Sequence, residues 1–458
     1  MSGAYRKVRK RIIYVSAITA FVILAAFFVL TRLFTADTIR KGIMIENTDV
    51  SWMTVDEAKR AILEHLAEQS DTGDITLIYG NRKWEVALRE IGYEYMVDNA
   101  LKQAYYIGRE GNIFRKLYNS ILLSIEGHSI NIEGSFDSDK LGDILERIKE
   151  ECDTDEKNAE ITYEDGEITF TREVVKRSLN IERSLEKAEK QLAAKDFSEI
   201  ELVVDEKKPH IVYEDIKEIN GVLSEFSTKF DTNDTNRTDN IKLACSRING
   251  TILLPGESFS MNKALGPRTR ENGYKEAPII FKNELVPGTG GGVCQVSTTL
   301  YNTVLLAGMN VIEREHHSIP LYYISPGRDA TITENSIDFR FVNNLEYAIC
   351  LQAGVKGNRL IIRVLGRKKE DDVVYKLKTD IIGVYNPEPP EIIYDNTLKP
   401  GEKKVERKEA KGLRVVLYRE AYKNGELQWR EKLTEDYYKP VRGKIRVAGD
   451  YSEEAANY

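Results

Sequence analysis

The sequence predicts a multidomain α+β protein with an N-terminal transmembrane helix. Three observations support this: a long apolar run near the N-terminus, two successive segments with the same order of helix and hairpin signals, and strand-rich patterns toward the C-terminus. We expect an anchor, two small α+β repeats, a mixed α+β domain and a C-terminal all-β module. The predicted boundaries are 1–11 for a cytoplasmic tail, 12–34 for the anchor, 40–125 and 126–210 for the repeats, 211–368 for the mixed domain and 369–458 for the β module.

The composition is that of packed globular domains. The chain has 458 residues, of which 41% are hydrophobic and 30% are charged, so long disordered regions are not expected. The net charge is −7, and residues of both signs are well mixed. Because nucleic-acid binding needs a concentrated basic face, we expect no nucleic-acid partner.

The apolar run covers residues 12–34 and follows five basic residues, Arg6, Lys7, Arg9, Lys10 and Arg11. About 20 apolar residues cross a bilayer as a helix. Basic residues before the span place the short tail in the cytoplasm and the bulk of the chain outside a cell membrane that it crosses once. The alternative is a cleaved signal peptide, but the run exceeds a usual signal core and no A-x-A site follows it.

The two predicted repeats share an order of elements. An amphipathic helix pattern comes first, in VDEAKRAILEHL and in SDKLGDILERI. A hairpin follows, turning at Gly80–Asn81 in one copy and at Asp165–Gly166 in the other. A second helix closes each unit, in GYEYMVDNALKQAYYIG and in LNIERSLEKAEKQLAA.

The mixed domain combines helix and strand patterns. A helical pattern covers residues 214–230, and a second helix is expected from Cys294 to Leu306. Strand-like runs then follow, such as IDFRFV and RLIIRVLG. In the last unit, Asn424–Gly425 between two strand-like runs predicts a β-hairpin.

The chain has four cysteines, Cys152, Cys245, Cys294 and Cys350. An even number outside the membrane allows two disulfides, but the wide, irregular spacing is not that of a disulfide-stapled scaffold. There is no C-x-x-C pair, so a zinc site is not expected, and the sequence indicates no cofactor.

Cys294 lies in GTGGGVCQVSTTLYN, at the end of a glycine-rich loop and at the start of a predicted helix. A helix N-terminus lowers the pKa of a thiol and so favours the nucleophilic thiolate. The backbone N–H groups of Gly291 and Gly292 can form an oxyanion hole, with Gln295 as a further donor. The alternative is a glycine turn followed by a buried, inert cysteine.

Two adjacent histidines, His316 and His317, follow Cys294 in the same predicted domain. Adjacent residues of an extended chain point to opposite sides, so one of them is expected to face the thiol, and we favour His317 as the base. Asp329 can orient the imidazole, and Arg328 can hold a substrate carboxylate through two hydrogen bonds. The alternative for this pair is a turn held by an internal Arg–Asp contact, and for the histidines a polar loop.

An ordered block of motifs in the mixed domain resembles the VanW domain family: GGGVCQVSTTLYNTVLLAG, EREHHS, YISPGRDATI and IDFRFVNN. The repeats resemble the peptidoglycan-binding domains that often accompany VanW domains. The last unit resembles the five-glycine module of wall-associated proteins. Some clostridial members of the VanW family are reported to be L,D-transpeptidases that use a cysteine of this domain. The sequence lacks the HGC signature of the better-known L,D-transpeptidase family.

The resemblance implies peptidoglycan stem peptides and glycan as partners, and a membrane-anchored, extracytoplasmic cell-wall enzyme. In this hypothesis Cys294 attacks an L,D bond of one stem peptide and passes the acyl group to an amine of another. A non-catalytic wall-binding or scaffold protein is the competing hypothesis, and a hydrolase is a third.

Overall fold

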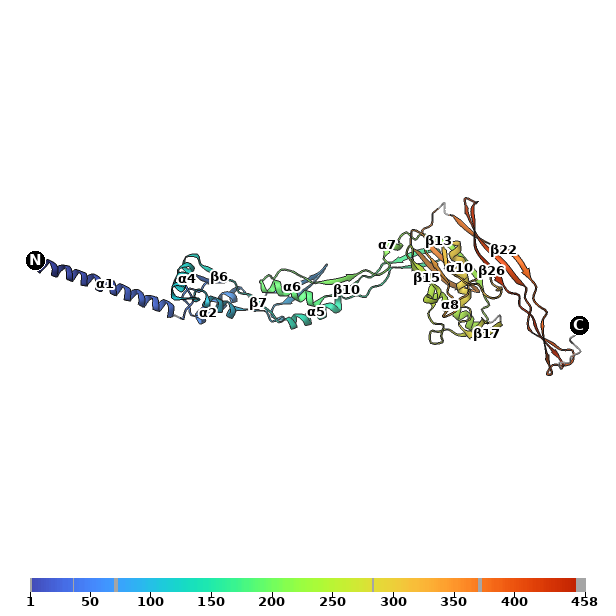
Figure 1. Ribbon diagram of the computed structural model, residues 1–458, viewed down its shortest axis with the longest axis horizontal. Coiled ribbons are helices and arrows are strands. Elements are labelled where there is room, and N and C mark those ends of the chain that lie inside the picture. Colours follow the sequence, from blue (N-terminus) through green and yellow to red (C-terminus); the bar gives the residue numbers. More distant parts are fainter. Residues whose placement is uncertain (1, 36, 70–72, 282–283, 370–372, 450–458) are drawn as a thin grey trace. The chain divides into compact units, whose positions relative to one another are not determined.

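The computed structural model describes residues 2–35, 37–69, 73–281, 284–369 and 373–449. The chain divides into two compact units: residues 1–155 with 176–207, and residues 156–175 with 208–458. Figure 1 labels the elements along the chain. The structure confirms a mixed α+β chain with one N-terminal apolar helix and an all-β C-terminal region.

The first unit contains six helices in the part of the chain that the structure describes. They are α1 (Ser2–Thr35), α2 (Val55–Gln69), α3 (Val97–Tyr106), α4 (Ile113–Glu126), α5 (Ser138–Cys152) and α6 (Ile181–Ala193). Its strands are β1 (Ile43–Ile45), β2 (Thr48–Asp49), β3 (Asp74–Tyr79), β4 (Arg82–Ala87), β5 (Glu94–Tyr95), β6 (His128–Ile130), β7 (Gly134–Ser135), β10 (Lys176–Leu179), β11 (Ile200–Glu201) and β12 (Val204–Lys207).

Helix α1 contains the predicted apolar span. Its stretch Arg6–Phe28 is long and apolar enough to cross a membrane, judged by length and composition, and none of it is buried in the protein. A signal sequence meets the same criteria of length and composition.

The first unit has two hydrophobic cores, and each draws on both predicted repeats. In one core, Ile75 and Leu77 of the β3–β4 hairpin pack with Leu141, Leu145 and Leu192 of α5 and α6. Strand β11 pairs in parallel with β3, and β6 pairs in parallel with β1. The hairpin turning at Gly80–Asn81 is confirmed, but it packs on helices that lie more than fifty residues further along the chain.

The second unit begins with an inserted hairpin and continues with the mixed domain. Its elements are β8 (Glu160–Glu164), β9 (Glu167–Thr171), α7 (Tyr213–Ile216), β13 (Gly221–Lys229), α8 (Thr235–Ile248), β14 (Ile252–Leu253), β15 (Ser258–Ser260), α9 (Met261–Leu265), β16 (Glu276–Phe281), β17 (Glu284–Thr289), α10 (Val293–Leu306), β18 (Asn310–Glu313), β19 (Arg340–Val342), β20 (Ile349–Lys356) and β21 (Arg359–Gly366). The hairpin predicted at Asp165–Gly166 is confirmed as β8–β9.

The helix predicted over residues 214–230 is wrong. The segment forms the four-residue helix α7 and then strand β13, which pairs antiparallel with β21. A partner at least 130 residues away supplies the backbone hydrogen bonds, and such long-range pairing overrides a local helical pattern. Strand β13 belongs to a sheet of order β13-β21-β20-β14.

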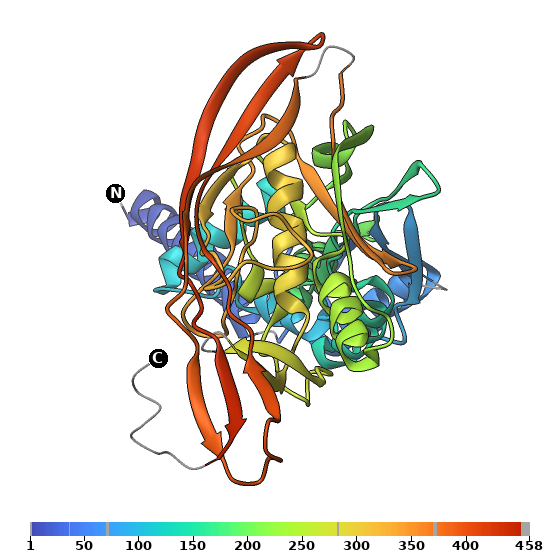
Figure 2. The same cartoon turned by 90° about the vertical axis from the view of Figure 1, so that its right-hand side faces the viewer.

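Helix α10 is the central helix of this unit, and its start at Val293 agrees with the prediction. It packs against β13 and β21 on one side and against β22 of the C-terminal module on another (Figure 2). Leu300 and Val304 are completely buried, as are the polar side chains of Thr299 and Thr303. Each of these two hydroxyls donates to the carbonyl four residues before it, so they add no unpaired polar groups to the core.

The C-terminal module is all-β, as predicted. It contains β22 (Val374–Tyr385), β23 (Glu391–Asp395), β24 (Lys403–Arg407), β25 (Gly412–Lys423), β26 (Glu426–Tyr438) and β27 (Lys444–Ala448), in two sheets of order β22-β25-β26 and β23-β27-β24. The predicted Asn424–Gly425 turn joins β25 to β26, and both turn residues have positive φ, at 54° and 86°. Two positive φ angles are what a type I′ hairpin turn requires.

Candidate active site

The glycine loop leads directly into helix α10. Gly290 and Gly292 have φ angles of 84° and 107°, which residues with a side chain rarely adopt. A Cβ at Gly291 would lie 2.6 Å from the carbonyl oxygen of Pro278, so that position has no room for a side chain. Helix α10 starts at Val293, which places Cys294 in its first turn.

The first turn of a helix has N–H groups without a partner inside the helix. Among the described residues, no acceptor is found for the backbone N–H groups of Gly291, Gly292 and Cys294. The N–H group of Val293 donates to the carbonyl of Gly290, and that of Gln295 donates to the carbonyl of Gly292. The free donors are therefore next to the thiol, as an oxyanion hole requires.

The thiol of Cys294 is partly buried and lies among polar groups. Its Sγ is 3.6 Å from the carbonyl oxygen of Ile332 and 3.8 Å from Oγ1 of Thr331. The imidazole of His317 is near enough to interact electrostatically with the thiol. The phenol of Tyr323 interacts with both Cys294 and Thr298.

His317 is fixed by Asp329. Oδ2 of this carboxylate lies 2.7 Å from Nδ1 of the imidazole and 2.7 Å from the backbone nitrogen of His317. Both side chains are almost fully buried. Because Nδ1 is held by the carboxylate, Nε2 is left for the thiol. His316 faces elsewhere: its Nδ1 contacts the carbonyl of His317, and its ring packs edge-on against Tyr438.

Electrostatics favour the charged form of this trio. Burial raises the pKa of the Cys294 thiol, but the interaction with His317 outweighs burial and lowers it to about 7. Burial lowers the pKa of His317, and its contacts with Asp329 and Cys294 outweigh this and raise it to about 9. The pKa of Asp329 falls to about 2, because His317 and Arg314 outweigh burial. Between the pKa of Cys294, about 7, and that of His317, about 9, the thiolate–imidazolium pair predominates.

Two other residues predicted for the site have their side chains engaged within the protein. Gln295 is completely buried; its amide donates to Thr228 Oγ1 and the Lys229 carbonyl, and accepts from Arg237. The Gln295 side chain therefore has no donor left for a substrate.

Arg328 donates through Nε to Asn302 Oδ1, 2.7 Å away, and its guanidinium lies over the ring of Phe226. The described residues show no contact between Arg328 and Cys294. The Asn302 side chain also donates to the Arg328 carbonyl, so this pair fixes the loop that carries Asp329 against α10.

The sequence reasoning missed three residues around the trio. Tyr323 and Thr331 lie beside the thiol, and Arg314 donates to the backbone carbonyl of Asp329. Thr331 and Tyr323 come from irregular segments after α10, where no periodic pattern indicates which side chains turn inward. Arg314 stands in the EREHHS motif, but nothing in the sequence indicates its buried position.

The remaining cysteines differ from Cys294. All four are free thiols, so the alternative of two disulfides is not realised in this structure. Cys245 and Cys350 are buried, and burial raises the pKa of each to about 12. No cluster of His, Cys, Asp or Glu suited to a metal occurs among the residues that the structure describes.

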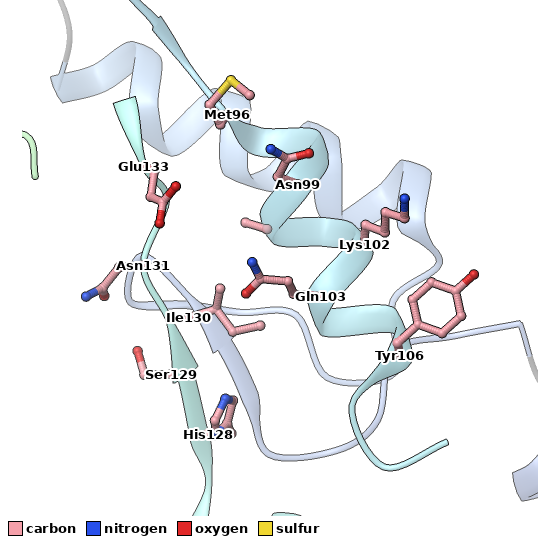
Figure 3. Close-up of a pocket in the computed structure, with 11 residues that line it drawn as sticks. Met96, Asn99, Lys102, Gln103, Tyr106, His128, Ser129, Ile130, Asn131 and Glu133 are labelled. Carbon is pink, nitrogen blue, oxygen red and sulfur yellow. The ribbon is translucent and has the colours of Figure 1, made fainter. Parts of the chain in front are cut away.

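The first unit has a separate groove of about 550 Å³. Helix α3 contributes one wall, with Asn99, Lys102, Gln103 and Tyr106, and the segment from His128 to Glu133 contributes the other (Figure 3). The lining combines amides, one cation, one acid and an exposed aromatic ring. Such a mixture suits a polar, hydroxyl-rich or peptide ligand better than a hydrophobic one.

Comparison with known proteins finds three domain matches. Residues 236–365 match the family described as "VanW like protein", residues 84–201 match "Putative peptidoglycan binding domain", and residues 384–449 match "G5 domain". The predicted resemblances are thus confirmed, and Cys294, His317 and Asp329 all lie within the first match. Together the three matches define the class: a cell-wall-associated protein of several domains.

Among curated proteins, the chain is 43% identical over 140 residues to "Uncharacterized protein YoaR" of Bacillus subtilis (strain 168), covering 31% of this chain and 46% of that protein. It is 28% identical over 147 residues to "Vancomycin B-type resistance protein VanW" of Enterococcus faecalis (strain ATCC 700802 / V583), covering 31% of this chain and 53% of that protein. The matched segment therefore spans about half the length of each relative.

Among solved structures, "IgA1 Protease G5 domain structure" is matched with a TM-score of 0.14 at 19% identity, over 19% of this chain and 100% of that one. "Crystal structure of HP0197-G5" gives 0.11 at 17% identity, over 16% of this chain and 96% of that one. At these TM-scores the structural matches add nothing to the domain match.

The first testable prediction concerns the charge state of Cys294. We expect alkylation of Cys294 by iodoacetamide, followed against pH by peptide mass spectrometry, to have a midpoint near pH 7. His317→Ala removes the cation that stabilises the thiolate, so the midpoint should rise toward that of a free thiol, about 8.5. Cys245 is the internal control, because a buried thiol should stay unmodified in the folded protein. A midpoint that is the same in both proteins would contradict the coupling.

Proposed function

We propose that the chain is a cysteine-dependent acyltransferase of the L,D-transpeptidase type, which cross-links peptidoglycan stem peptides. The observation that carries the proposal is the arrangement of Cys294, His317 and Asp329 beside free backbone N–H groups. A nucleophile, a base and a group that orients the base form the set that acyl transfer through a covalent intermediate needs. The confirmed match to peptidoglycan-binding and wall-associated domains supports the choice of substrate.

In the first half of the proposed reaction, the Cys294 thiolate attacks the carbonyl carbon of an L,D peptide bond. Negative charge moves to the carbonyl oxygen, where the N–H groups of Gly292 and Cys294 can stabilise it. The C–N bond then breaks, and the His317 imidazolium gives its Nε2 proton to the departing amine of the terminal D-amino acid. A thioester and a neutral imidazole remain.

In the second half, a side-chain amine of a neighbouring stem attacks the thioester. His317 takes a proton from this amine, the C–S bond breaks, and the new peptide bond forms with return of the thiolate–imidazolium pair. Activity should be highest between about pH 7 and pH 9, where Cys294 is ionised and His317 is protonated. If water takes the place of the amine, the same steps give a hydrolase.

We further propose that α1 remains attached as a membrane anchor and that the residues after it lie outside the cytoplasm. The basic residues before the apolar stretch support this orientation. The domain matches support an extracytoplasmic location, because their expected partner is the cell wall.

The reaction itself gives the second prediction. Cys294→Ala and Cys294→Ser should both abolish cross-linking of disaccharide-tetrapeptides by the full chain, measured by mass spectrometry of the products. Serine nearly preserves the volume of the side chain, but its hydroxyl ionises far less readily than a thiol. The unchanged protein should also gain the mass of an acyl group at Cys294.

Cys245→Ala is the matched control, since this buried cysteine has no histidine partner among the described residues and the variant should cross-link normally. Cross-linking at the unchanged rate by the Cys294 variants would remove the enzyme and leave a wall-binding protein. Release of the terminal D-amino acid without cross-links would indicate a hydrolase.

A binding role is favoured independently by the groove between α3 and β6. We propose that it holds peptidoglycan, with the amides of Asn99, Gln103 and Asn131 as hydrogen-bonding groups. β6 pairs with β1 on one side and is an edge strand of its sheet, so its other side can pair with an extended stem peptide. The groove lies inside the segment that matches the peptidoglycan-binding family.

The third prediction tests this groove. The double variant Asn99→Ala/Gln103→Ala should bind purified sacculi about ten-fold more weakly, because two net hydrogen bonds are lost at about 0.5–1.5 kcal/mol each. Co-sedimentation of the full chain measures the affinity. Gln191→Ala is the control, because this α6 amide contacts Ser198 and Asp196 and is not among the groove residues. Equal binding by all three proteins would place the wall contact elsewhere.

A further inference from the structure

Helix α4 has its polar and apolar faces reversed relative to an ordinary surface helix. Phe114, Tyr118, Ile121 and Ile125 follow one another at four-, three- and four-residue spacing, so they share one side of the helix. That side is exposed: these four residues are 80%, 64%, 52% and 76% accessible. No residue of α4 is fully buried.

The opposite side of α4 faces the protein and is mostly polar. Lys116, Asn119, Ser120 and Leu123 are the less exposed residues there, and Leu123 packs against Gly42 and Gly108. A surface helix normally buries its apolar stripe and exposes its polar one. An exposed stripe of this kind marks a surface that another partner covers.

Both ends of α4 are held close to the end of the membrane anchor. Before the helix, Tyr105 donates to Asp37 and Arg109 donates to the carbonyl of Thr38, each at 2.6 Å. After it, His128 donates its backbone N–H to the carbonyl of Gly42 at 2.7 Å. Helix α1 ends at Thr35, so these contacts are made two, three and seven residues past its end.

We propose that α4 lies in the surface of the bilayer that α1 crosses, with its Phe114–Ile125 stripe inserted among the lipids. The reversed helix supplies an apolar face, and the short connection to α1 keeps that face at the membrane. Aromatic and aliphatic residues on one side of a helix that lies in the membrane plane are typical of interfacial helices. Arg115 on the flank can contact anionic lipid headgroups. This inference rests on the proposed anchorage of α1 and is independent of the proposed chemistry.

The test, and the fourth prediction, uses the full chain in vesicles of phosphatidylethanolamine and phosphatidylglycerol. With p-benzoylphenylalanine in place of Phe114, irradiation should attach phospholipid to the protein, as detected by mass. The same probe in place of Tyr106 is the control, because this α3 residue is 58% exposed but lies in the groove. Ile121→Ser/Ile125→Ser should reduce the lipid adduct formed at position 114.

Flotation of the chain with the vesicles reports separately that α1 is inserted. In a floating protein, an absent adduct at position 114, or equal adducts at positions 114 and 106, overturns the proposal. A cross-link from position 114 to a second copy of the chain also overturns it, because the stripe would then be a dimer interface.

A second and independent observation concerns the C-terminal module. The hydroxyl of Tyr438, at the end of β26, donates to Oδ1 of Asp329 and accepts the backbone N–H of Gly327 at 2.7 Å. Asp436, two residues earlier on β26, accepts from Arg314 at 2.7 Å, and Arg314 in turn donates to the carbonyl of Asp329. The side chains of Arg314, Asp329 and Asp436 are each no more than 5% exposed.

The same module is attached to α10 itself. Arg419 of β25 donates to the carbonyl oxygen of Met309, just after the helix ends, at 2.9 Å. The ring of Tyr375 lies directly against Gly308, where a Cβ would come within 2.6 Å of it. The module therefore contacts both the helix that carries Cys294 and the loop that carries Asp329.

We infer that Tyr438 is a positioning residue for the Cys294–His317–Asp329 trio. Its hydroxyl holds Oδ1 of Asp329, which leaves Oδ2 directed at His317. The β module is then part of the active unit and not a separate wall-binding attachment. This inference deepens the proposed function.

The fifth prediction uses thiol reactivity, which needs no substrate and so separates this inference from the proposed reaction. In the full chain, Tyr438→Phe should raise the pH midpoint of Cys294 alkylation by about one unit, because a loosened Asp329 holds the imidazolium less well. Tyr437→Phe is the matched control, since this neighbour points to the other side of β26 and packs against Tyr385. It should leave the midpoint near 7.

An unchanged midpoint in Tyr438→Phe overturns the inference. A lowered midpoint also overturns it. If Asp329 stayed in place after losing this hydrogen bond, its carboxylate would stabilise the imidazolium more strongly, and the pKa of the thiol would fall. If thermal unfolding shows that Tyr438→Phe does not fold, Asp436→Asn tests the other connection between the module and the Asp329 loop, which runs through Arg314, and an unchanged midpoint then overturns the assignment of the module to the active unit. In this variant Arg314 pairs with Asp329 and no longer with Asp436. Asp329 then stabilises the imidazolium less, so the alkylation midpoint should again rise.

Discussion

The buried carboxylate of Asp329 is the group on which the arrangement of the second unit depends. An ionised carboxylate is costly to remove from water unless hydrogen bonds and opposite charge compensate it. Here the compensation comes from His317 and Arg314, which both belong to the EREHHS segment, and from Tyr438 of the C-terminal module. Each partner reduces the cost of the charge, and each is fixed in return. The carboxylate thus joins the histidine loop, the glycine–arginine turn and the C-terminal module into one packed structure.

The local features of the site could be predicted from the sequence because they depend on neighbouring residues. Glycines next to an apolar 3.6-residue pattern place Cys294 at a helix start, and consecutive histidines on an extended chain leave one facing inward. The structure brings His317, and not His316, to the side chain of Asp329. The role of Gln295 could not be read in the same way, because its partners Thr228, Lys229 and Arg237 are brought to it only by tertiary packing.

The fold shows the same division between local and long-range information. Hairpins with Asn-Gly or Asp-Gly turns were predicted correctly, since the turn residues themselves set the geometry. Strand β13 was mistaken for a helix because its partner β21 lies far along the chain. The shared cores of the first unit could not be predicted either, as β11 and β6 pair with strands from the earlier predicted repeat. Weak similarity between the two segments carries no information about which helix covers which hairpin.

The parallel pairing of β1 with β6 has a mechanical consequence. With α1 anchored as proposed, the chain enters the first unit before β1 and leaves the β1–β6 pair at the C-terminal end of β6. A pull between membrane and wall therefore loads the N-terminal end of one strand and the C-terminal end of its neighbour. In this geometry the hydrogen bonds between Ile43–Ile45 and His128–Ile130 share the force in shear and do not open one at a time. Tension would pass across this pair, and the stretch 46–127, which contains α3, would share the load mainly through the hydrogen bonds of Tyr105 to Asp37 and of Arg109 to Thr38.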